Sequence, residues 1–342
     1  MAKLFGKEWT RAELLAHVGD LSQVAGVRLL ELSDGVERGV RAADVRTGGG
    51  LEFTVLLDRG MDIGTASYKG LPLAWISPAG FAHPAHFEPE GPGWLRTFGG
   101  GLMTGCGLTY LGAPGEDEGE PLGLHGRLSH LPARHVGSGQ EWEMDECSFW
   151  VDGELRQARL FGENLALTRR IETWLGQNRL NIHDTVENLG DSSTPLMMLY
   201  HINLGFPLLD ASCRLEAPAH NVRPRDKVAE PGIGEWMRFQ EPTTGYKEQA
   251  FIHNLPADAD GWASTKLINP TLGVWLRVRF RKESLPNLVQ WKQMGQGAYV
   301  LGLEPANCGV EGRAKDRERG TLEFLEPDES REFEVEIEVG EA

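Results

Sequence analysis

Apolar and polar residues alternate with a period of two along several segments of the chain. In residues 272–280 every second position is apolar, and Arg277 and Arg279 fall between them. Residues 331–339 alternate four apolar residues with four glutamates. A period of two is the pattern of a β-strand with one face on a core. The glutamates protect the solvent face of the second segment from edge pairing.

Further strands are predicted where apolar runs are bounded by turn residues. The tripeptide Gly-Gln-Asn at 176–178 separates two runs into a hairpin. A turn at 327–330 joins residues 322–325 to the strand 331–339 as a second hairpin. One further run, 196–204, is too apolar to face water on either side. The additional strands predicted in this way are 51–57, 167–175, 180–186 and 196–204.

One helix is predicted, from Thr10 to Val18, where Thr10 caps the first turn and Glu13 completes a capping box. Elsewhere 43 glycines and 19 prolines are spread evenly, which favours many short strands joined by turns. No linker, low-complexity tract or short repeat divides the sequence. We therefore predict an all-β protein, a large β-sandwich of two sheets packed face to face. It is expected to be a single domain over residues 1–342, with residues 1–45 as an N-terminal extension packed on it.

The amino-acid composition limits the kinds of molecule that the protein is expected to bind. The 342 residues carry a formal net charge of −16, so a nucleic-acid backbone or an anionic membrane would be repelled, whereas a neutral sugar would not. The first residues contain no apolar signal segment, and no run approaches the roughly 20 apolar residues of a membrane span. A cytoplasmic location is therefore expected. A homodimer is compatible with the sequence, which does not determine the oligomeric state.

Several common functional motifs are missing. The four cysteines form no Cys-x-x-Cys pair, and neither a phosphate-binding Gly-x-x-x-x-Gly-Lys nor a Gly-x-Ser-x-Gly nucleophile elbow occurs. His83 and His86, followed by Glu88 and Glu90, have the chemistry of metal ligands. Pro84, however, prevents a regular helix from placing the two histidines on one face. We expect no metal and no cofactor.

Three short segments place titratable groups among glycine, proline or apolar neighbours. His125 lies between Leu124 and Gly126, and Arg127 shares its face in an extended chain. His201 and Asn203 share one face of the apolar run 196–204. Glu304 ends another apolar strand, just before a proline. A buried carboxylate is costly unless it is hydrogen-bonded, and burial moves its pKa toward that of a general base at neutral pH.

In their order and spacing these segments resemble the aldose 1-epimerase or galactose mutarotase superfamily, over about residues 50–340. The superfamily has a Leu-His-Gly segment, a strand with a second histidine followed by Asn-Leu, and a late glutamate at a strand end. The corresponding residues here are 124–126, 201–204 and 303–304. Four further motifs resemble a little-characterised branch that is only aldose 1-epimerase-like: 57–63, 94–101, 124–127 and 301–305.

The resemblance implies a role for each matching residue. Glu304 matches the base that takes the proton from the anomeric hydroxyl, and His201 the acid that protonates the ring oxygen. His125 matches a histidine that hydrogen-bonds near the ring oxygen, and Arg96 a sugar-binding arginine. Glu248 stands where the superfamily has an aspartate, and its longer side chain reaches a different point on the ring.

Further substrate-binding residues are expected around these three. Sugars bind through apolar rings against their C–H faces and through charged groups at their hydroxyls. Mutarotation itself needs only a base and an acid on either side of the anomeric centre, with pKa values near neutrality. The remaining substrate-binding candidates are Arg59, Asp62, Trp75, Arg127, Asn203, Trp291 and Lys292.

The sequence thus predicts an isomerase, a metal-independent mutarotase or epimerase of an aldose or related pyranose. Three alternatives stay open: an epimerase of a phosphorylated or otherwise anionic sugar, a non-catalytic carbohydrate-binding module, and a metal-dependent isomerase. A local cluster of arginines would suffice for the first. Glu304, His201 and His125 together argue against the second, because recognition alone needs no acid and base.

Overall fold

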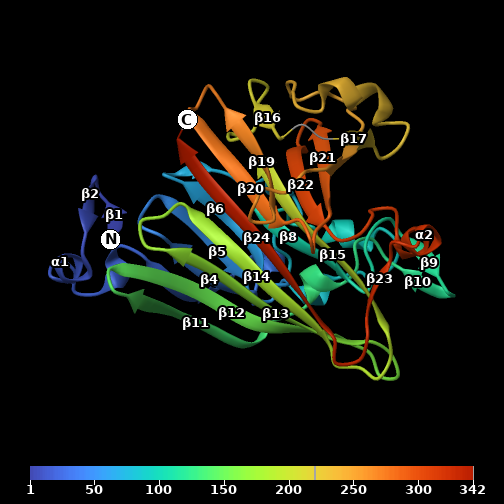
Figure 1. The fold of residues 1–342 in the computed structure, drawn as a ribbon, viewed down its shortest axis with the longest axis horizontal. Coiled ribbons are helices and arrows are strands. Elements are labelled where there is room, and N and C mark those ends of the chain that lie inside the picture. Colours follow the sequence, from blue (N-terminus) through green and yellow to red (C-terminus); the bar gives the residue numbers. More distant parts are fainter. Residues whose placement is uncertain (219–220, 342) are drawn as a thin grey trace.

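Two antiparallel sheets make up most of the protein (Figure 1). The computed structural model describes residues 1–218 and 221–341. The smaller sheet has eight strands in the order β11 (Arg134–Glu143), β12 (Glu146–Ala158), β13 (Asn164–Trp174), β14 (Arg179–Asn188), β24 (Ser330–Glu341), β20 (Val274–Arg281), β19 (Trp262–Asn269) and β16 (Arg214–Glu216). The predicted all-β sandwich is confirmed.

The larger sheet has twelve strands. Ten of them follow the order β17 (Asn221–Pro224), β18 (Gln249–Asn254), β21 (Asn287–Met294), β22 (Tyr299–Ala306), β15 (Thr194–Gly205), β8 (Met103–Leu108), β6 (Asp62–Tyr68), β5 (Leu51–Leu56), β4 (Arg41–Arg46) and β3 (Gly26–Glu31). The other two are β23 (Glu323–Leu325), paired with β15, and β7 (Leu71–Pro72), paired with β6.

Small elements complete the described chain. Two hairpins lie outside the main sheets, β1 (Ala2–Leu4) with β2 (Lys7–Trp9), and β9 (Gly115–Asp117) with β10 (Glu120–Leu122). The helices are α1 (Arg11–Leu15) and α2 (Arg313–Arg319). Among the described residues, neither helix combines the length and hydrophobicity that crossing a bilayer requires.

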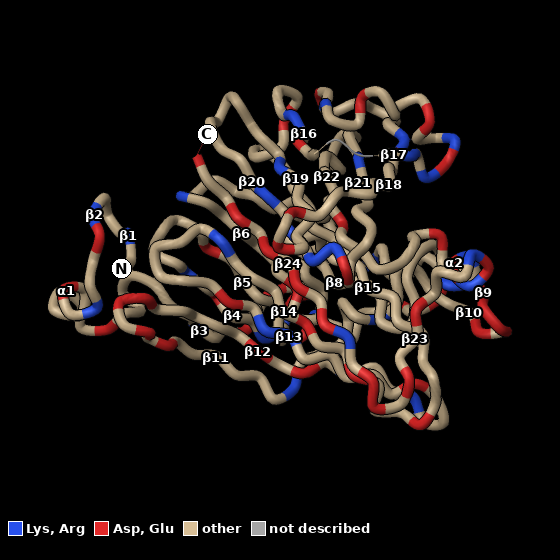
Figure 2. Tube along the Cα trace, in the orientation of Figure 1, with Lys and Arg blue, Asp and Glu red and all other residues tan. Residues whose placement is uncertain are grey.

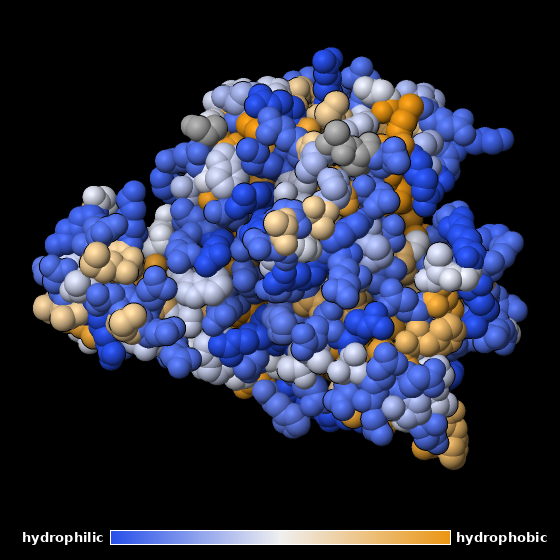
Figure 3. Space-filling model, in the orientation of Figure 1, coloured by the Kyte–Doolittle hydropathy of each residue, from blue (hydrophilic) through white to orange (hydrophobic). Residues whose placement is uncertain are grey.

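Alternation along the strands builds the core between the sheets. On β20 the residues Val274, Leu276, Val278 and Phe280 are buried, and the arginines between them form ion pairs with glutamates of β24 on the outer face. Figure 2 shows these basic and acidic positions side by side along the two strands. The surface in the same orientation is largely hydrophilic (Figure 3). The period-two prediction for these strands is therefore confirmed.

Strand β15 is buried on both faces, as its apolar composition predicted. Tyr200 and Ile202 point into the core between the sheets. Met197 and Leu199 point to the other side, into a second cluster with Trp94. Segments outside the sheets, including the turn at Gly93–Arg96, therefore cover the outer face of the large sheet at this point. His201 belongs to that covered outer face.

Two local predictions were wrong in part. The segment 322–325 does not form a hairpin with β24, because β23 pairs with the start of β15, where Leu325 is fully buried. The predicted helix from Thr10 to Val18 ends at Leu15, and Leu14 is its one buried residue. Its capping box between Thr10 and Glu13 is present.

The N-terminal region has two parts. Residues of β1, β2 and α1 form a small apolar cluster against Cys147, Phe149 and Leu175. Strands β3 and β4, which lie largely within the segment expected as an extension, are hydrogen-bonded members of the large sheet. Only the residues before Gly26 therefore lie outside that sheet. That the chain is a single domain stays a prediction.

Candidate active site

A cavity of about 670 Å³ opens on the outer face of the large sheet. Its floor comes from β15, β21 and β22, which contribute His201, Val289, Trp291 and Glu304. Segments between strands form the walls. The wall and rim residues are Trp75, Ser77, Trp94, Leu95, Phe98, Ala113, Leu124, His125, Arg225, Asp226, Glu248, Ala250, Val310 and Glu311.

His201 and Glu304 meet at the bottom of this cavity. Strands β15 and β22 are antiparallel, and Ile202 lies opposite Leu303. This register places His201, one residue before Ile202, opposite Glu304, one residue after Leu303. The His201 Nε2 and Glu304 Oε1 atoms are 3.3 Å apart, and both side chains are less than a tenth exposed. Gly302 makes room for the carboxyl group, because a Cβ there would lie 2.4 Å from Glu304 Oε1. The glycine of the motif 301–305 thus has a steric role.

Burial sets the protonation of the pair. It raises the pKa of Glu304 to about 8, while the Arg225 charge opposes the rise. Burial also lowers the pKa of His201 to about 3, and the neighbouring His125 adds to this. Because the two groups are in contact, they titrate as a pair. Near neutral pH the pair carries one proton and no net charge, and the proton resides on the carboxyl group.

Three polar atoms in this cavity have no hydrogen-bond partner among the described residues. They are His125 Nδ1, His201 Nδ1 and Glu304 Oε1. Buried polar atoms are normally paired, and leaving one unpaired costs about 1–3 kcal/mol. Glu304 Oε1 lies 3.3 Å from His201 Nε2, so a proton shared across that contact relieves part of this cost.

Aromatic rings surround the pair. The His201 ring lies 5.4 Å from Phe98 and 5.4 Å from Trp291, and the His125 ring packs edge-on against Trp94 at 4.8 Å. The rings of His125 and His201 are 6.2 Å apart. This packing fixes the positions of both imidazoles and leaves apolar faces toward the cavity.

The turn that carries His125 depends on Gly126. His125 has a φ of 55° and Gly126 a φ of 75°. A Cβ on Gly126 would lie 2.3 Å from the carbonyl oxygen of Tyr110. The backbone of His125 is held from both sides, since its N–H donates to Gly112 and its carbonyl accepts from Gly107. The Leu-His-Gly segment therefore needs its glycine to aim the histidine.

A charged group forms one side of the cavity. Glu248 accepts a hydrogen bond from Trp291 Nε1 at 2.8 Å and is paired with Arg225 Nη2 at 3.2 Å. Arg225 also donates to Asp226 at 2.8 Å. Although burial opposes it, these two carboxylates raise the pKa of Arg225. Arg225 was not among the predicted site residues, because it follows β17 in a segment with no pattern that marks it.

Half of the twelve predicted site residues line the cavity. They are Trp75, His125, His201, Glu248, Trp291 and Glu304. Arg96 is not among them, because it is exposed and paired with Glu88 at 3.2 Å, whereas Trp94 and Leu95 from the same turn face the cavity. Arg127 is exposed and lines a separate small hollow beside the β9–β10 hairpin.

Two other predicted residues lie on strands of the site without reaching the cavity. The Asn203 amide is buried and donates to the carbonyls of Gly101 and His201, so it holds the backbone of β15. Lys292 is on the opposite face of β21 from Trp291, where its ammonium group donates to two backbone carbonyls. Burial lowers its pKa.

Arg59 and Asp62 lie deeper still. The buried Arg59 guanidinium donates to the carbonyls of Ala82 and Thr97, and so anchors the segment that carries the aromatic wall. Asp62 accepts from the backbone N–H of Gly105, and burial raises its pKa to about 7. The motif 57–63 therefore positions neighbouring segments, and neither Arg59 nor Asp62 lines the cavity.

The histidines weighed as metal ligands lie on a short turn. His83 Nδ1 accepts a hydrogen bond from the backbone of Ala85, two residues on. Within residues 1–218 and 221–341, no three His, Cys, Asp or Glu side chains are grouped as a metal ion would need. That the protein works without a metal stays a prediction.

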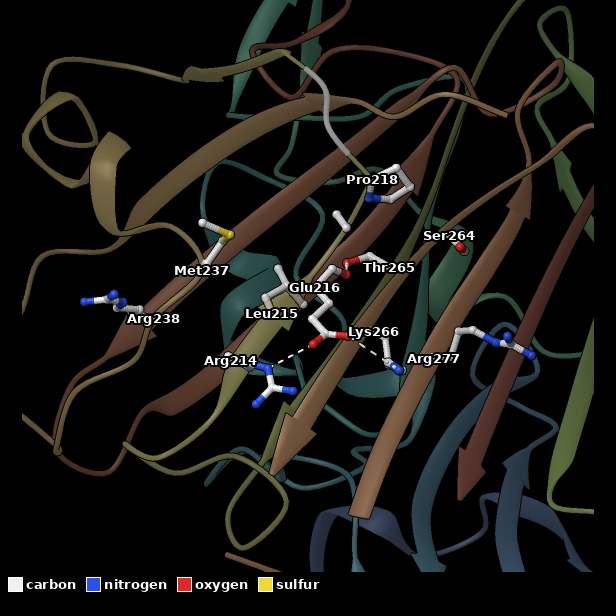
Figure 4. Close-up of a pocket in the computed structure, with 11 residues that line it drawn as sticks. Arg214, Leu215, Glu216, Pro218, Met237, Arg238, Ser264, Thr265, Lys266 and Arg277 are labelled. Carbon is white, nitrogen blue, oxygen red and sulfur yellow. Dashed lines mark hydrogen bonds and ion pairs between the residues drawn. The ribbon is translucent and has the colours of Figure 1, made fainter. Parts of the chain in front are cut away.

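A second hollow, of about 640 Å³, lies on the outer face of the small sheet. In Figure 4, Glu216 faces Arg214 and Lys266, with which it forms ion pairs of 2.9 and 3.5 Å. All three side chains are at least a third exposed. Met237, Arg238 and Arg277 also line this hollow.

Several solved structures with this fold are named aldose 1-epimerases or galactose mutarotase-like proteins. A Klebsiella pneumoniae protein provisionally named an aldose 1-epimerase aligns over 93% of this chain and 86% of its own, with a TM-score of 0.88 and 24% identity. A galactose mutarotase-like protein from Clostridium acetobutylicum covers 94% and 100%, with a TM-score of 0.66 and 12% identity. A galactose 1-epimerase from Lactobacillus acidophilus covers 93% and 99%, with a TM-score of 0.57 and 16% identity. At these identities the likeness concerns the fold.

The chain belongs to the family described as a domain of unknown function, DUF4432, whose sequence profile matches residues 37–339. A comparison with curated proteins gave no match. The matched range contains every residue that lines the cavity. The predicted resemblance to the mutarotase superfamily is thus confirmed at the level of the fold.

Proposed function

We propose that this protein is a mutarotase, an isomerase that interconverts the anomers of an aldose or related pyranose. The observation that carries the proposal is the contact of Glu304 with His201, buried at the bottom of an aromatic-walled cavity. The aromatic rings beside this contact support it, because apolar ring faces suit the C–H side of a sugar.

The His201–Glu304 pair can carry out the two proton transfers that mutarotation needs. Opening the ring removes one proton from the anomeric hydroxyl O1 and delivers one to the ring oxygen, and the C1–ring oxygen bond breaks. In the ionised form of the pair, Glu304 accepts the O1 proton and His201 protonates the ring oxygen. His125 hydrogen-bonds near the ring oxygen. The open-chain aldehyde then rotates and recloses on its other face, and the two proton transfers run in reverse.

The form with the proton on Glu304 serves the same reaction. In that form the carboxyl group donates and the His201 ring accepts, so each step still has one acid and one base. The two forms differ by one proton across the 3.3 Å contact. A pair of this kind needs neither metal nor nucleotide, which is consistent with the expectation of no cofactor.

We assign the binding of the sugar to the side chains that form the sides of the main cavity. Trp75 and Trp291 present apolar faces for the C–H side of a sugar, and Arg225 and Glu248 offer donors and acceptors for its hydroxyls. Glu248 takes the place of the superfamily aspartate. Its bonds to Trp291 and Arg225 hold the longer side chain in one orientation.

The charges around the cavity favour a neutral sugar over a phosphorylated one. Arg225 is the only arginine or lysine among the described lining residues, and Asp226 and Glu248 already neutralise it. Glu311 adds a further acidic group at the rim. A phosphate would find no uncompensated cation in the main cavity. The cytoplasmic location and the oligomeric state stay predictions.

The test is a panel of freshly dissolved, pure anomers followed by polarimetry or one-dimensional NMR. The protein is expected to speed the approach to anomeric equilibrium for at least one neutral aldose. Saturable binding of a sugar without any acceleration would contradict the enzyme and favour the non-catalytic carbohydrate-binding module.

A further inference from the structure

The cavity does not end at Arg225. A side chamber of about 130 Å³ continues from it and shares Arg225, Val289, Val310 and Glu311 with the main cavity. The chamber adds Arg223, Ile252, Asn287, Asp316 and Arg319 to the lining. It lies beside the reacting pair, along the same face of the large sheet.

Strand periodicity explains the continuation. On β21 the main cavity is lined by Trp291 and Val289, and the chamber by Val289 and Asn287. On β18, Ala250 lines the cavity and Ile252 lines the chamber. Both steps are two residues, so the same face of the sheet continues by about 7 Å along each strand.

The chamber offers unpaired polar groups. Within the part of the chain that the structure describes, the side chains of Arg223 and Asn287 form no hydrogen bond or ion pair. At its mouth Arg319 is paired with Glu311 at 2.5 Å, and both are partly exposed. Three arginines line the chamber, and each has a carboxylate near it: Arg225 is paired with Glu248, Arg319 with Glu311, and the Arg223 charge helps to lower the pKa of Glu311. This balance suits hydroxyl groups better than an anion.

We propose that the chamber is a subsite for a glycosyl substituent, so that the preferred substrate is a neutral reducing disaccharide or longer oligosaccharide. The inference rests on the proposed function. The reducing ring lies over Glu304 and His201, and the second ring reaches Asn287 and Arg223. Only the reducing ring reacts, and no bond between the rings is made or broken.

The experiment compares matched sugars by polarimetry and NMR. The aldoses are glucose, galactose, mannose and xylose, each set against its 4-linked disaccharide: maltose or cellobiose, galactobiose, mannobiose or xylobiose. The expected result is a kcat/KM for at least one disaccharide that exceeds that of its monosaccharide about tenfold. Arg223→Ala and Asn287→Ala should each reduce that ratio about five- to tenfold, the loss of a hydrogen bond or two, with the monosaccharide rate within twofold of wild type.

Arg38→Ala is the matched control, since Arg38 is an exposed arginine outside both cavities and should change neither rate. Acceleration of monosaccharides with disaccharides no better, or equal losses on both sugars in the two chamber variants, would overturn the subsite and leave the mutarotase intact. A protein that speeds none of these sugars would overturn the proposed function as well.

Discussion

The cavity at Glu304 and the hollow at Glu216 have nearly the same volume, about 670 and 640 Å³, and both are lined by charged and apolar side chains. They differ in how deeply the glutamate is buried and in which side chains it contacts. Glu304 is buried beside a histidine, and burial raises its pKa to about 8. Glu216 is exposed and bonded to Arg214, which lowers its pKa, as does Lys266.

This difference separates the site that we propose to be reactive from a solvated surface. A carboxylate paired with cations in water is satisfied and held ionised, so it has little tendency to exchange protons near neutral pH. A buried carboxyl group against a neutral imidazole titrates near neutral pH, because burial raises its pKa to about 8. Volume alone therefore does not distinguish the two cavities, whereas the burial of the carboxyl group does.

The largest expected effect is on the rate. Glu304→Gln keeps the volume of the side chain but cannot accept or exchange the proton, so mutarotation should fall by about 10² to 10⁴. Sugar binding, measured by calorimetry, should stay within a few-fold. His201→Asn should behave similarly, and the double variant should be little worse because both groups serve one proton-transfer cycle.

Glu216→Gln is the matched control for this loss and should leave the rate unchanged. Near-normal mutarotation in Glu304→Gln would show that the base lies elsewhere, and Glu248 would be the next carboxylate to test because it also lines the cavity.

A smaller effect is expected from the aromatic wall. Trp291→Phe removes the hydrogen bond from Nε1 to Glu248 and frees that carboxylate to move. KM should rise about three- to tenfold, with a smaller change in kcat, because the lost interaction binds substrate and transition state alike. Trp275→Phe loses a comparable bond, to the Glu341 carbonyl on the outer face of the small sheet, and should not change KM. Equal changes in the two variants would refute the assignment.

The two carboxyl groups should also differ in how they affect stability with pH. The folded pKa of Glu304 is raised from 4.5 to about 8, so the native state holds its proton more tightly. This stabilisation is complete below about pH 4.5 and is lost as the pH rises through 8. Glu304→Gln cannot ionise and so does not undergo this loss of stability at high pH. Its Tm should therefore exceed that of wild type by a margin that grows from pH 5 to pH 8.

Glu216→Gln should show a constant, small Tm difference from wild type between pH 5 and pH 8, because the lowered pKa of Glu216 changes stability only below the ordinary carboxyl range. Its lowered pKa stabilises the protein above the ordinary carboxyl range, and exposure keeps the contribution small. Scanning calorimetry over this pH range tests both variants. A Tm margin for Glu304→Gln that shrinks as the pH rises would contradict the buried, protonated carboxyl group.

The smallest expected effect is that of chelation. If Glu304 and His201 work alone, dialysis against a chelator should leave the mutarotation rate unchanged. Activity that disappears and returns with a divalent ion would move the chemistry toward His83 and His86. The variant pair His83→Ala and His86→Ala would then distinguish a metal site from a structural turn.

Much of the architecture was predictable because it rests on local patterns. The alternation in 272–280 and 331–339 predicts β20 and most of β24, and the Gly-Gln-Asn turn predicts the hairpin of β13 and β14. The pairing of β23 with β15 was not predictable. Neighbours in sequence favour a hairpin, but the burial of Leu325 against a distant strand outweighs that preference.

The residues of the candidate site also differ in whether the local sequence marks them. His125, His201 and Glu304 stand out in the sequence because a titratable residue among apolar or glycine neighbours is costly and calls for a reason. Arg225 does not stand out, since an arginine among polar residues is ordinary. Arg59, Asn203 and Lys292 attract notice for the right physical reason, burial of a polar group, but their partners are backbone carbonyls and not a ligand.

The sequence by itself determined the β-sandwich class and the positions of His201 and Glu304 on apolar strands, because both depend on residue type and on alternation along a single strand. The roles of acid and base came from the resemblance to the mutarotase superfamily. Only the tertiary structure decided which charged side chains share one cavity and which hold the backbone. That outcome depends on distances between residues as far apart as His125, Arg225 and Glu304. Such distances follow from sheet order and loop packing, which no local pattern contains.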